Sequence, residues 1–279
     1  MIHYTLSNGV QIPGIGFGCY DLPKERGEET LLSAIQAGYR HFDTASVYGT
    51  EEAVGRAVRD SGLPRDDFFL TTKLWRDQMD DPMAAFQASL KALGTDYVDL
   101  YLIHWPRPDL ERGDWRELDR TVWRCLEELY RGGAVRAIGV SNFLPHHLMA
   151  LMEECEVRPM VDQLEYHPGY AQEAAVGWCQ SQGIQVEGWS PVARMRLNHD
   201  PQLNALAQRY GVTVPRLCLR FAVQNQVIPL PKSSAPERMA ANLDLFGFTI
   251  SEEDMFRLRT LPQLGWGGEH PDRERVRLA

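Results

Sequence analysis

The chain alternates short apolar segments with longer segments in which apolar residues recur every three or four positions. The short segments are apolar on both faces, which is typical of buried parallel strands. The longer segments follow a helical period and stop at glycines such as Gly38 and Gly132, as many helices do. The pattern predicts eight strands, at 15–18, 41–43, 68–73, 98–104, 137–141, 160–165, 185–189 and 227–230.

Each predicted strand is followed by at least one predicted helix. Eight such units fit an α/β fold of the closed (β/α)8 TIM-barrel type, which typically has about 250 residues. A doubly wound sheet is the alternative. No linker or low-complexity stretch divides the chain, so we expect residues 1–279 to form a single domain. The predicted helices are 28–37, 51–60, 82–93, 115–130, 145–155, 172–182, 201–210, 214–224 and 236–243.

Two further elements flank the eight units. The Asn8-Gly9 pair favours a two-residue hairpin turn, which would pair 4–6 with 10–12. Because this hairpin precedes the first barrel strand, we expect it to close the bottom of the barrel. A C-terminal helix is predicted at 251–261, and the tail after it, rich in Gly, Pro and Arg, is predicted to be irregular.

The composition is that of an ordinary globular protein, with 44% hydrophobic and 24% charged residues. A net charge of −9 argues against nucleic acid as a partner, because phosphate binding needs a basic surface. No apolar leader and no run of about 18 apolar residues occurs, so we expect a soluble cytoplasmic protein with no membrane partner. Five cysteines without a Cys-x-x-Cys pair indicate neither a disulfide framework nor a zinc site.

His146 and His147 are the one pair of residues that suggests a metal. Adjacent residues on a helix point in different directions, and no carboxylate or cysteine lies at ligand spacing. We therefore expect both histidines at the surface and no metal site.

Four side chains at strand ends indicate chemistry, since active sites of such barrels lie where strands end. The second strand ends at Asp43, with Tyr48 just beyond it, and the next two strands end at Lys73 and His104. A phenol has a pKa of about 10 and is a poor acid near neutral pH. Lys73 would lower that pKa, Asp43 would hold Lys73 charged, and His104 would orient a substrate oxygen.

Each of these four residues alone is better explained by an ordinary structural role, such as a loop carboxylate or a half-buried aromatic ring. Their convergence at adjacent strand ends favours the catalytic interpretation. A positioned phenol that delivers a proton to a carbonyl oxygen indicates carbonyl reduction, with hydride from a cofactor.

Four segments resemble the signatures of the aldo-keto reductase family. Gly-Tyr-Arg-His-Phe-Asp-Thr-Ala-x-x-Tyr-x-x-Glu from Gly38 matches the first. Val-Asp-Leu-Tyr-Leu-Ile-His-Trp-Pro from Val98 matches the strand that carries the family histidine. Gly-Val-Ser-Asn-Phe from Gly139 and Ile-Pro-Leu-Pro-Lys-Ser from Ile228 match two more.

The resemblance implies an NADP-dependent reductase of aldehydes, keto sugars or keto acids, in which Tyr48 donates the proton, Asp43 and Lys73 tune it, and His104 orients the carbonyl. NADPH is expected, with NADH less favoured. Ala241 stands where many relatives have a glutamate over the adenosine, which leaves the strength of that preference open. The implied cofactor contacts are Ser141, Asn142, Gln163, Trp189, Ser190, Val192, Arg194, Lys232, Ser233, Ser234, Arg238 and Asn242.

Parts of this cofactor site also follow from chemistry. Lys232, Ser233 and Arg238 open a predicted helix, whose N-terminus favours phosphate, and they match the pocket for the 2′-phosphate of NADPH. A solvated helix start is the alternative. Arg194 could reach the pyrophosphate or simply be solvated.

The substrate wall is predicted to contain Tyr20, Val47, Trp75, Trp105 and Trp266. The ending Gly-Glu-His-Pro-Asp at 268–272 resembles the tails of bacterial 2,5-diketo-D-gluconate reductases, which favours small keto sugars, keto acids or reactive aldehydes. We expect a monomer. A non-catalytic NADPH-binding auxiliary subunit on the same fold, or a barrel of unrelated chemistry with a phosphate site, are the alternatives.

Overall fold

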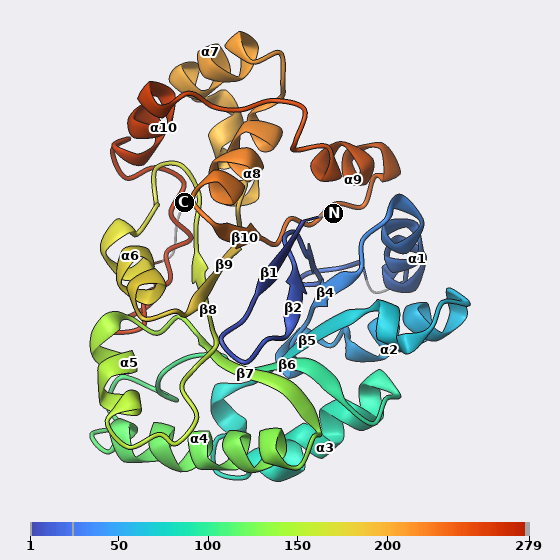
Figure 1. Cartoon of the computed structure of the whole chain (residues 1–279), viewed down its shortest axis with the longest axis vertical. Coiled ribbons are helices and arrows are strands. Elements are labelled where there is room, and N and C mark those ends of the chain that lie inside the picture. Colours follow the sequence, from blue (N-terminus) through green and yellow to red (C-terminus); the bar gives the residue numbers. More distant parts are fainter. Residues whose placement is uncertain (1, 24, 277–279) are drawn as a thin grey trace.

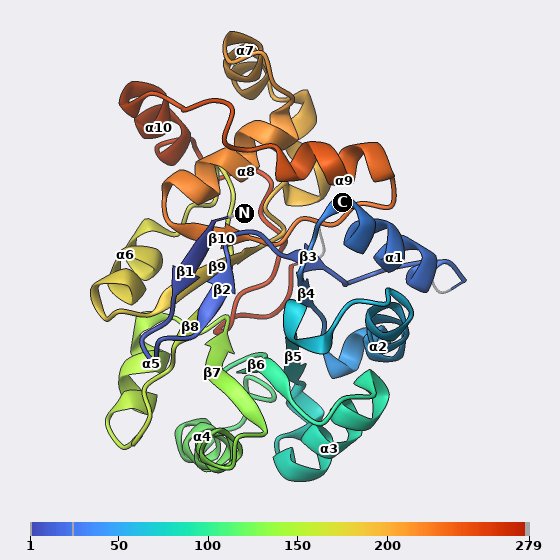
Figure 2. The same ribbon diagram turned by 45° about the vertical axis from the view of Figure 1, so that its right-hand side comes forward.

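Eight parallel strands curl into a barrel in the computed structural model, which describes residues 2–23 and 25–276 (Figures 1 and 2). The first and last strands meet, because Gly16 N donates to Pro229 O and Gly18 N to Pro231 O, both at 3.0 Å. The TIM-barrel prediction is confirmed. In order, the strands are β3 (Phe17–Gly18), β4 (His41–Asp43), β5 (Phe69–Leu74), β6 (Val98–Ile103), β7 (Val135–Ser141), β8 (Val161–Glu165), β9 (Gln185–Trp189) and β10 (Val227–Pro229).

Helices surround these strands, and the bounds of several match the prediction because local signals set them. In α3, the Asp81 side chain accepts a hydrogen bond from Ala84 N, Pro82 opens the first turn, and Gly94 ends the helix in the left-handed conformation. The outer helices are α1 (Gly27–Ala37), α2 (Glu51–Asp60), α3 (Pro82–Leu93), α4 (Trp115–Arg131), α5 (Pro145–Met152), α6 (Glu173–Ser181), α7 (Pro201–Arg209), α8 (Val214–Gln224) and α9 (Pro236–Leu243).

The N-terminal hairpin covers the bottom of the barrel. Strands β1 (His3–Thr5) and β2 (Gln11–Pro13) pair antiparallel. Asn8 Nδ2 donates to Arg136 O at 2.9 Å, near the residue where β7 begins. Because β7 begins beside this contact, the hairpin lies at the amino ends of the strands, as predicted.

The turn of this hairpin differs from the prediction. Leu6 N donates to Val10 O, so three residues, 7–9, connect the strands where two were expected. Gly9 has φ 89°, a left-handed conformation that glycine adopts without strain.

The C-terminal tail, which follows one last helix, lies at the other end of the barrel from the hairpin. Helix α10 (Glu252–Arg259) begins where Ser251 Oγ accepts from Asp254 N. From 262 to 276 the chain is irregular, as predicted, and Figure 2 shows this dark-red tail crossing the ring of strands. Leu264 N donates to Gly169 O, and Arg196 donates to Gly265 O, so the loops after β8 and β9 hold it in place.

The contact between α2 and α3 should be sensitive to one methyl group. A Cβ at Gly55 would lie 2.1 Å from Leu93 O, a backbone atom that cannot move alone. We expect Gly55→Ala to lower the free energy of unfolding by about 1–3 kcal/mol through overpacking. Gly177→Ala in α6 is the matched control, because its Cβ would meet open space and should stabilise by about 0.5–1 kcal/mol. Urea unfolding measures both, and equal stabilities would contradict the close approach.

Candidate active site

Four polar side chains converge at the carboxyl ends of β4, β5 and β6. Lys73 Nζ donates to Asp43 Oδ1 at 2.6 Å, and Lys73 is fully buried. Tyr48 Oη lies 3.3 Å from His104 Nε2, and Lys73 Nζ lies 5.1 Å from the centre of the Tyr48 ring. The structure therefore brings together all four residues that the sequence placed at strand ends.

The segment after β4 places Tyr48. A single 3-10 turn (Ser46–Tyr48) follows the strand, and Gly49, with φ 65°, reverses the chain into α2. Lys73 supports this turn from β5, since its Nζ donates to Thr44 O at 2.9 Å and its carbonyl accepts from Ser46 Oγ at 3.2 Å. The lysine thus positions the loop as well as supplying charge.

Burial shapes the electrostatics of the pair formed by Lys73 and Tyr48. Burial opposes the charge of Lys73, but Asp43 and Tyr48 favour it and leave the pKa of Lys73 raised. Burial raises the pKa of Tyr48 to about 12, while Lys73 lowers it by less. Lys73 does lower the pKa of Tyr48, as predicted, but the prediction of a lowered pKa overall is wrong, because burial raises it by more. Tyr48 is therefore a protonated phenol at neutral pH.

His104 is a neutral imidazole at neutral pH. Burial, together with the charges of Lys73 and Arg76, holds its pKa well below the usual range. Its backbone carbonyl accepts from Asn142 Nδ2 at 3.0 Å, which links the end of β6 to the end of β7. A neutral histidine can donate one hydrogen bond to a substrate oxygen.

Glu187 joins the site and was missed from the sequence. Gln163 Nε2 donates to Asp43 Oδ2 at 2.8 Å and to Glu187 Oε2 at 2.9 Å, so a hydrogen-bonded chain runs from Lys73 to β9. Burial and the nearby Asp43 raise the pKa of Glu187 to about 8. Its signal was a carboxylate in the middle of the buried segment 185–189.

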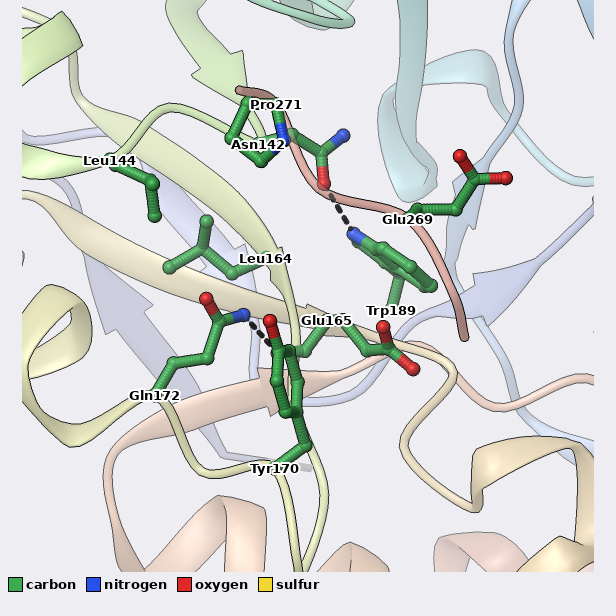
Figure 3. Close-up of a pocket in the computed structure, with 9 residues that line it drawn as sticks. All are labelled: Asn142, Leu144, Leu164, Glu165, Tyr170, Gln172, Trp189, Glu269 and Pro271. Atoms are coloured by element: carbon green, nitrogen blue, oxygen red, sulfur yellow. Dashed lines mark hydrogen bonds between the residues drawn. The ribbon is translucent and has the colours of Figure 1, made fainter. Parts of the chain in front are cut away.

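The predicted nicotinamide residues meet at the ends of β7, β8 and β9. Trp189 Nε1 donates to Asn142 Oδ1 at 2.9 Å, as Figure 3 shows. Ser141 Oγ donates to Gln163 O at 2.8 Å. Asn142 and Ser190 both have positive φ, a conformation that turns each chain sharply after its strand. These groups are held by one another in a fixed arrangement.

The predicted phosphate residues gather at the start of α9. Arg238 Nε donates to Ser233 Oγ at 3.2 Å, and Ser234 is exposed beside them. Lys232 lies 3.8 Å from Asp21 Oδ2 and donates to its backbone carbonyl, which ties α9 to the loop after β3. Two cations and a helix N-terminus suit a phosphate group.

Three further predicted cofactor residues differ in exposure. Arg194 is exposed, in a left-handed conformation, with its guanidinium 5.4 Å from the ring centre of Tyr20. Val192 is half-buried, whereas Asn242 is only 9% exposed. Arg194 therefore connects the loop after β9 with the predicted substrate wall.

Two predicted wall residues contact the site directly. The Tyr20 ring lies 5.1 Å from the Tyr48 ring, and the Trp75 ring lies 5.0 Å from that of His104. The other three predicted wall residues are the exposed Val47, the buried Trp105, and Trp266, which lies 6.2 Å from Tyr170.

The C-terminal tail forms one side of a pocket beside Trp189. Figure 3 shows the tail segment with Glu269 and Pro271 passing over Trp189 and Asn142. The tail therefore borders the position predicted for the nicotinamide. The pocket is lined by Asn142, Leu144, Leu164, Glu165, Tyr170, Gln172, Trp189, Glu269 and Pro271.

His146 and His147 anchor this tail. The prediction of a surface position is correct for His146, which is exposed, and wrong for His147, and the prediction that the two side chains point apart is wrong. His147 is buried, and the two rings are 3.9 Å apart. Their Nε2 atoms lie 3.2 and 3.0 Å from the carboxylate of Asp272. Asp272 stands far away in the sequence, so ligand spacing could not reveal it.

The same group fits an anchor better than a metal site. Leu144 N donates to His147 Nδ1 at 3.0 Å, so the neutral ring carries its proton on Nε2, where a metal would need a lone pair. Burial lowers the pKa of His147 to about 4 and keeps the ring neutral. Arg107 also pairs with Asp272, and a second cation there would repel a metal ion.

Fold and site together define a (β/α)8-barrel protein with its chemistry at the carboxyl ends of the strands. Residues 14–262 match the Aldo/keto reductase family. The chain is 39% identical to a glyoxal reductase of Bacillus subtilis, covering 96% of this chain and 95% of that protein.

Solved structures of aldo-keto reductases are similar to this chain over nearly its whole length. An aldo-keto reductase from a Medee basin deep-sea metagenome library superposes with a TM-score of 0.87 at 36% identity, covering 98% of this chain and 97% of that one. A Bombyx mori aldo-keto reductase in complex with NADP superposes with a TM-score of 0.85 at 33% identity, covering 99% of this chain and 95% of that one.

This chain therefore belongs to the aldo/keto reductase family. It is an oxidoreductase that uses a nicotinamide cofactor. None of the described helices has the length and hydrophobicity needed to span a bilayer.

Glu187 should make stability depend on pH. Its pKa is raised to about 8, so the folded protein keeps a proton that the unfolded chain releases above about pH 4.3. Folding therefore becomes less favourable as pH rises through this window. We expect Glu187→Gln to lose less stability than the wild type between about pH 5 and pH 8, because a glutamine carbonyl still accepts from Gln163. Urea unfolding at both pH values measures this. An unchanged slope, equal to that of the exposed control Glu173→Gln, would contradict it.

Proposed function

We propose that this protein reduces small carbonyl compounds with NADPH, using Tyr48 as the proton donor. The observation that carries the proposal is the placement of Tyr48 Oη 3.3 Å from His104 Nε2, beside the buried Lys73–Asp43 pair. A carbonyl oxygen that accepts from both Tyr48 and His104 would be polarised by two donors in a site that burial shields from water.

The residues of the chain would handle the proton. The nicotinamide, when bound, supplies the hydride to the carbonyl carbon. The oxygen then gains charge and takes the proton of Tyr48 Oη, a downhill transfer, because an alkoxide is a stronger base than a phenolate. Lys73 stabilises the phenolate that remains, and Asp43 keeps Lys73 charged.

NADPH is the proposed cofactor, with NADH weaker. Lys232, Ser233 and Arg238 would bind its 2′-phosphate, because two cations and a hydroxyl at a helix start provide strong donors. The Bombyx mori relative, in complex with NADP, supports this. Ser141, Asn142 and Gln163 would bind the carboxamide, Trp189 would stack on the ring, and the remaining contacts would come from Ser190, Val192, Arg194, Ser234 and Asn242.

Small keto sugars, keto acids and reactive aldehydes are the proposed substrates, bordered by Tyr20, Val47, Trp75, Trp105 and Trp266. A relative named glyoxal reductase supports small aldehydes. The tail at 268–272 supports the 2,5-diketo-D-gluconate reductase group within the family. A single domain over 1–279, a monomer and a cytoplasmic location stay predictions.

Removal of the Tyr48 hydroxyl tests the proton donor. We expect Tyr48→Phe to lower kcat about 10²–10⁴-fold, because a general acid contributes that much, while NADPH still quenches protein fluorescence. Tyr97→Phe, at the opposite end of β6, is the control and should keep its activity. A Tyr48→Phe variant with more than about a tenth of wild-type activity would exclude the assignment. A wild-type protein that binds NADPH but does not oxidise it when aldehydes are supplied would favour an auxiliary subunit.

Neutralising the start of α9 tests the cofactor preference. We expect Arg238→Met, alone and with Lys232→Met, to raise the KM for NADPH about 10- to 100-fold per charge, since each charged hydrogen bond contributes that much. The KM for NADH, which lacks the 2′-phosphate, should barely change and serves as the internal control. Equal losses with both cofactors would place the 2′-phosphate elsewhere.

A further inference from the structure

Arg76 lies beside the site and neither donates nor accepts the proton in the proposed reaction. It opens a 3-10 turn (Arg76–Gln78) directly after β5. Its guanidinium is 4.4 Å from the ring centre of Trp105 and 5.6 Å from that of Trp75, the tryptophan that contacts His104. Its charge contributes to the lowered pKa of His104. The cation therefore stands over the two tryptophans that flank the catalytic histidine.

No carboxylate of the described chain forms an ion pair with this cation. Arg76 forms no side-chain hydrogen bond or ion pair with residues 2–23 or 25–276, and its Nε is buried without an acceptor. The neighbouring arginine differs, because Arg107 pairs with Asp272. Glu269 is the carboxylate whose charge acts on Arg76, yet its own ion pair, at 2.8 Å, is with Arg275.

A half-buried guanidinium without an acceptor is unfavourable, because burial removes water that would otherwise solvate the charge. A planar fork of N–H donors fits a carboxylate best, with two parallel hydrogen bonds. The net charge of −9 repels anions at long range, so an acidic substrate needs a local cation to bind here.

We propose that Arg76 determines specificity by binding the carboxylate of an anionic carbonyl substrate, so that oxo acids are preferred over neutral carbonyls of the same shape. This rests on the proposed function and narrows its substrate class. The carboxylate is unchanged in the reaction, in which hydride adds to the carbonyl carbon and the proton of Tyr48 to its oxygen.

Matched pairs of acid and ester test the proposal with the intact enzyme and NADPH. The probes are 4-carboxybenzaldehyde against methyl 4-formylbenzoate, and succinic semialdehyde against its methyl ester. The wild type should favour at least one acid. Arg76→Leu should lower kcat/KM for that acid about 10- to 100-fold, mainly through KM, and change the ester less than about threefold. Arg76→Lys should restore part of the preference.

Arg116→Leu is the control, because Arg116 also lies 4.4 Å from a tryptophan ring centre, on the outer helix α4, and is exposed. It should leave the ratio of acid to ester unchanged. A wild type without acid preference in either pair, or an Arg76→Leu variant that loses acid and ester equally, would overturn the role of Arg76 and leave the reductase proposal intact. No reduction of any probe would overturn both.

Discussion

The buried ion pair between Lys73 and Asp43 is the interaction on which the site depends. Lys73 is completely enclosed, and an isolated ammonium there would lose its charge. Asp43 prevents this, and Gln163 holds Asp43 from the far side at 2.8 Å. Loss of one partner of such a pair typically destabilises a protein by about 3–5 kcal/mol. The charge that we propose to serve the chemistry therefore also joins β4, β5 and β8 at the top of the barrel.

A second set of charges fixes what lies above the barrel. The carboxylate of Asp272 pairs with Arg107, His146 and His147, so one side chain of the tail contacts both the loop after β6 and the start of α5. This anchor sets Glu269 and Pro271 against Trp189 (Figure 3). The tail is irregular in backbone but determined in position, which explains how a segment without secondary structure can border a binding site.

The sequence predicted what local signals determine. The bounds of α3, α8 and α9 agree with the structure because a capping side chain, a proline or a glycine marks each of them. Tyr48, Lys73 and His104 were found because parallel strands bring their carboxyl ends together. Interactions across the fold were not predictable: the Asp272 anchor and the contact between Gln163 and Glu187 join residues on different elements. The net shift of the Tyr48 pKa depends on burial, which a sequence does not state.

Neutron diffraction from deuterated crystals at about pH 7 would test the protonation states directly. We expect one deuteron on Tyr48 Oη, three on Lys73 Nζ and one deuteron on only one of the two ring nitrogens of His104, because the pKa values of Tyr48 and Lys73 are raised and that of His104 is lowered. A neutral Lys73 amine, or a Tyr48 oxygen without a deuteron, would contradict this expectation.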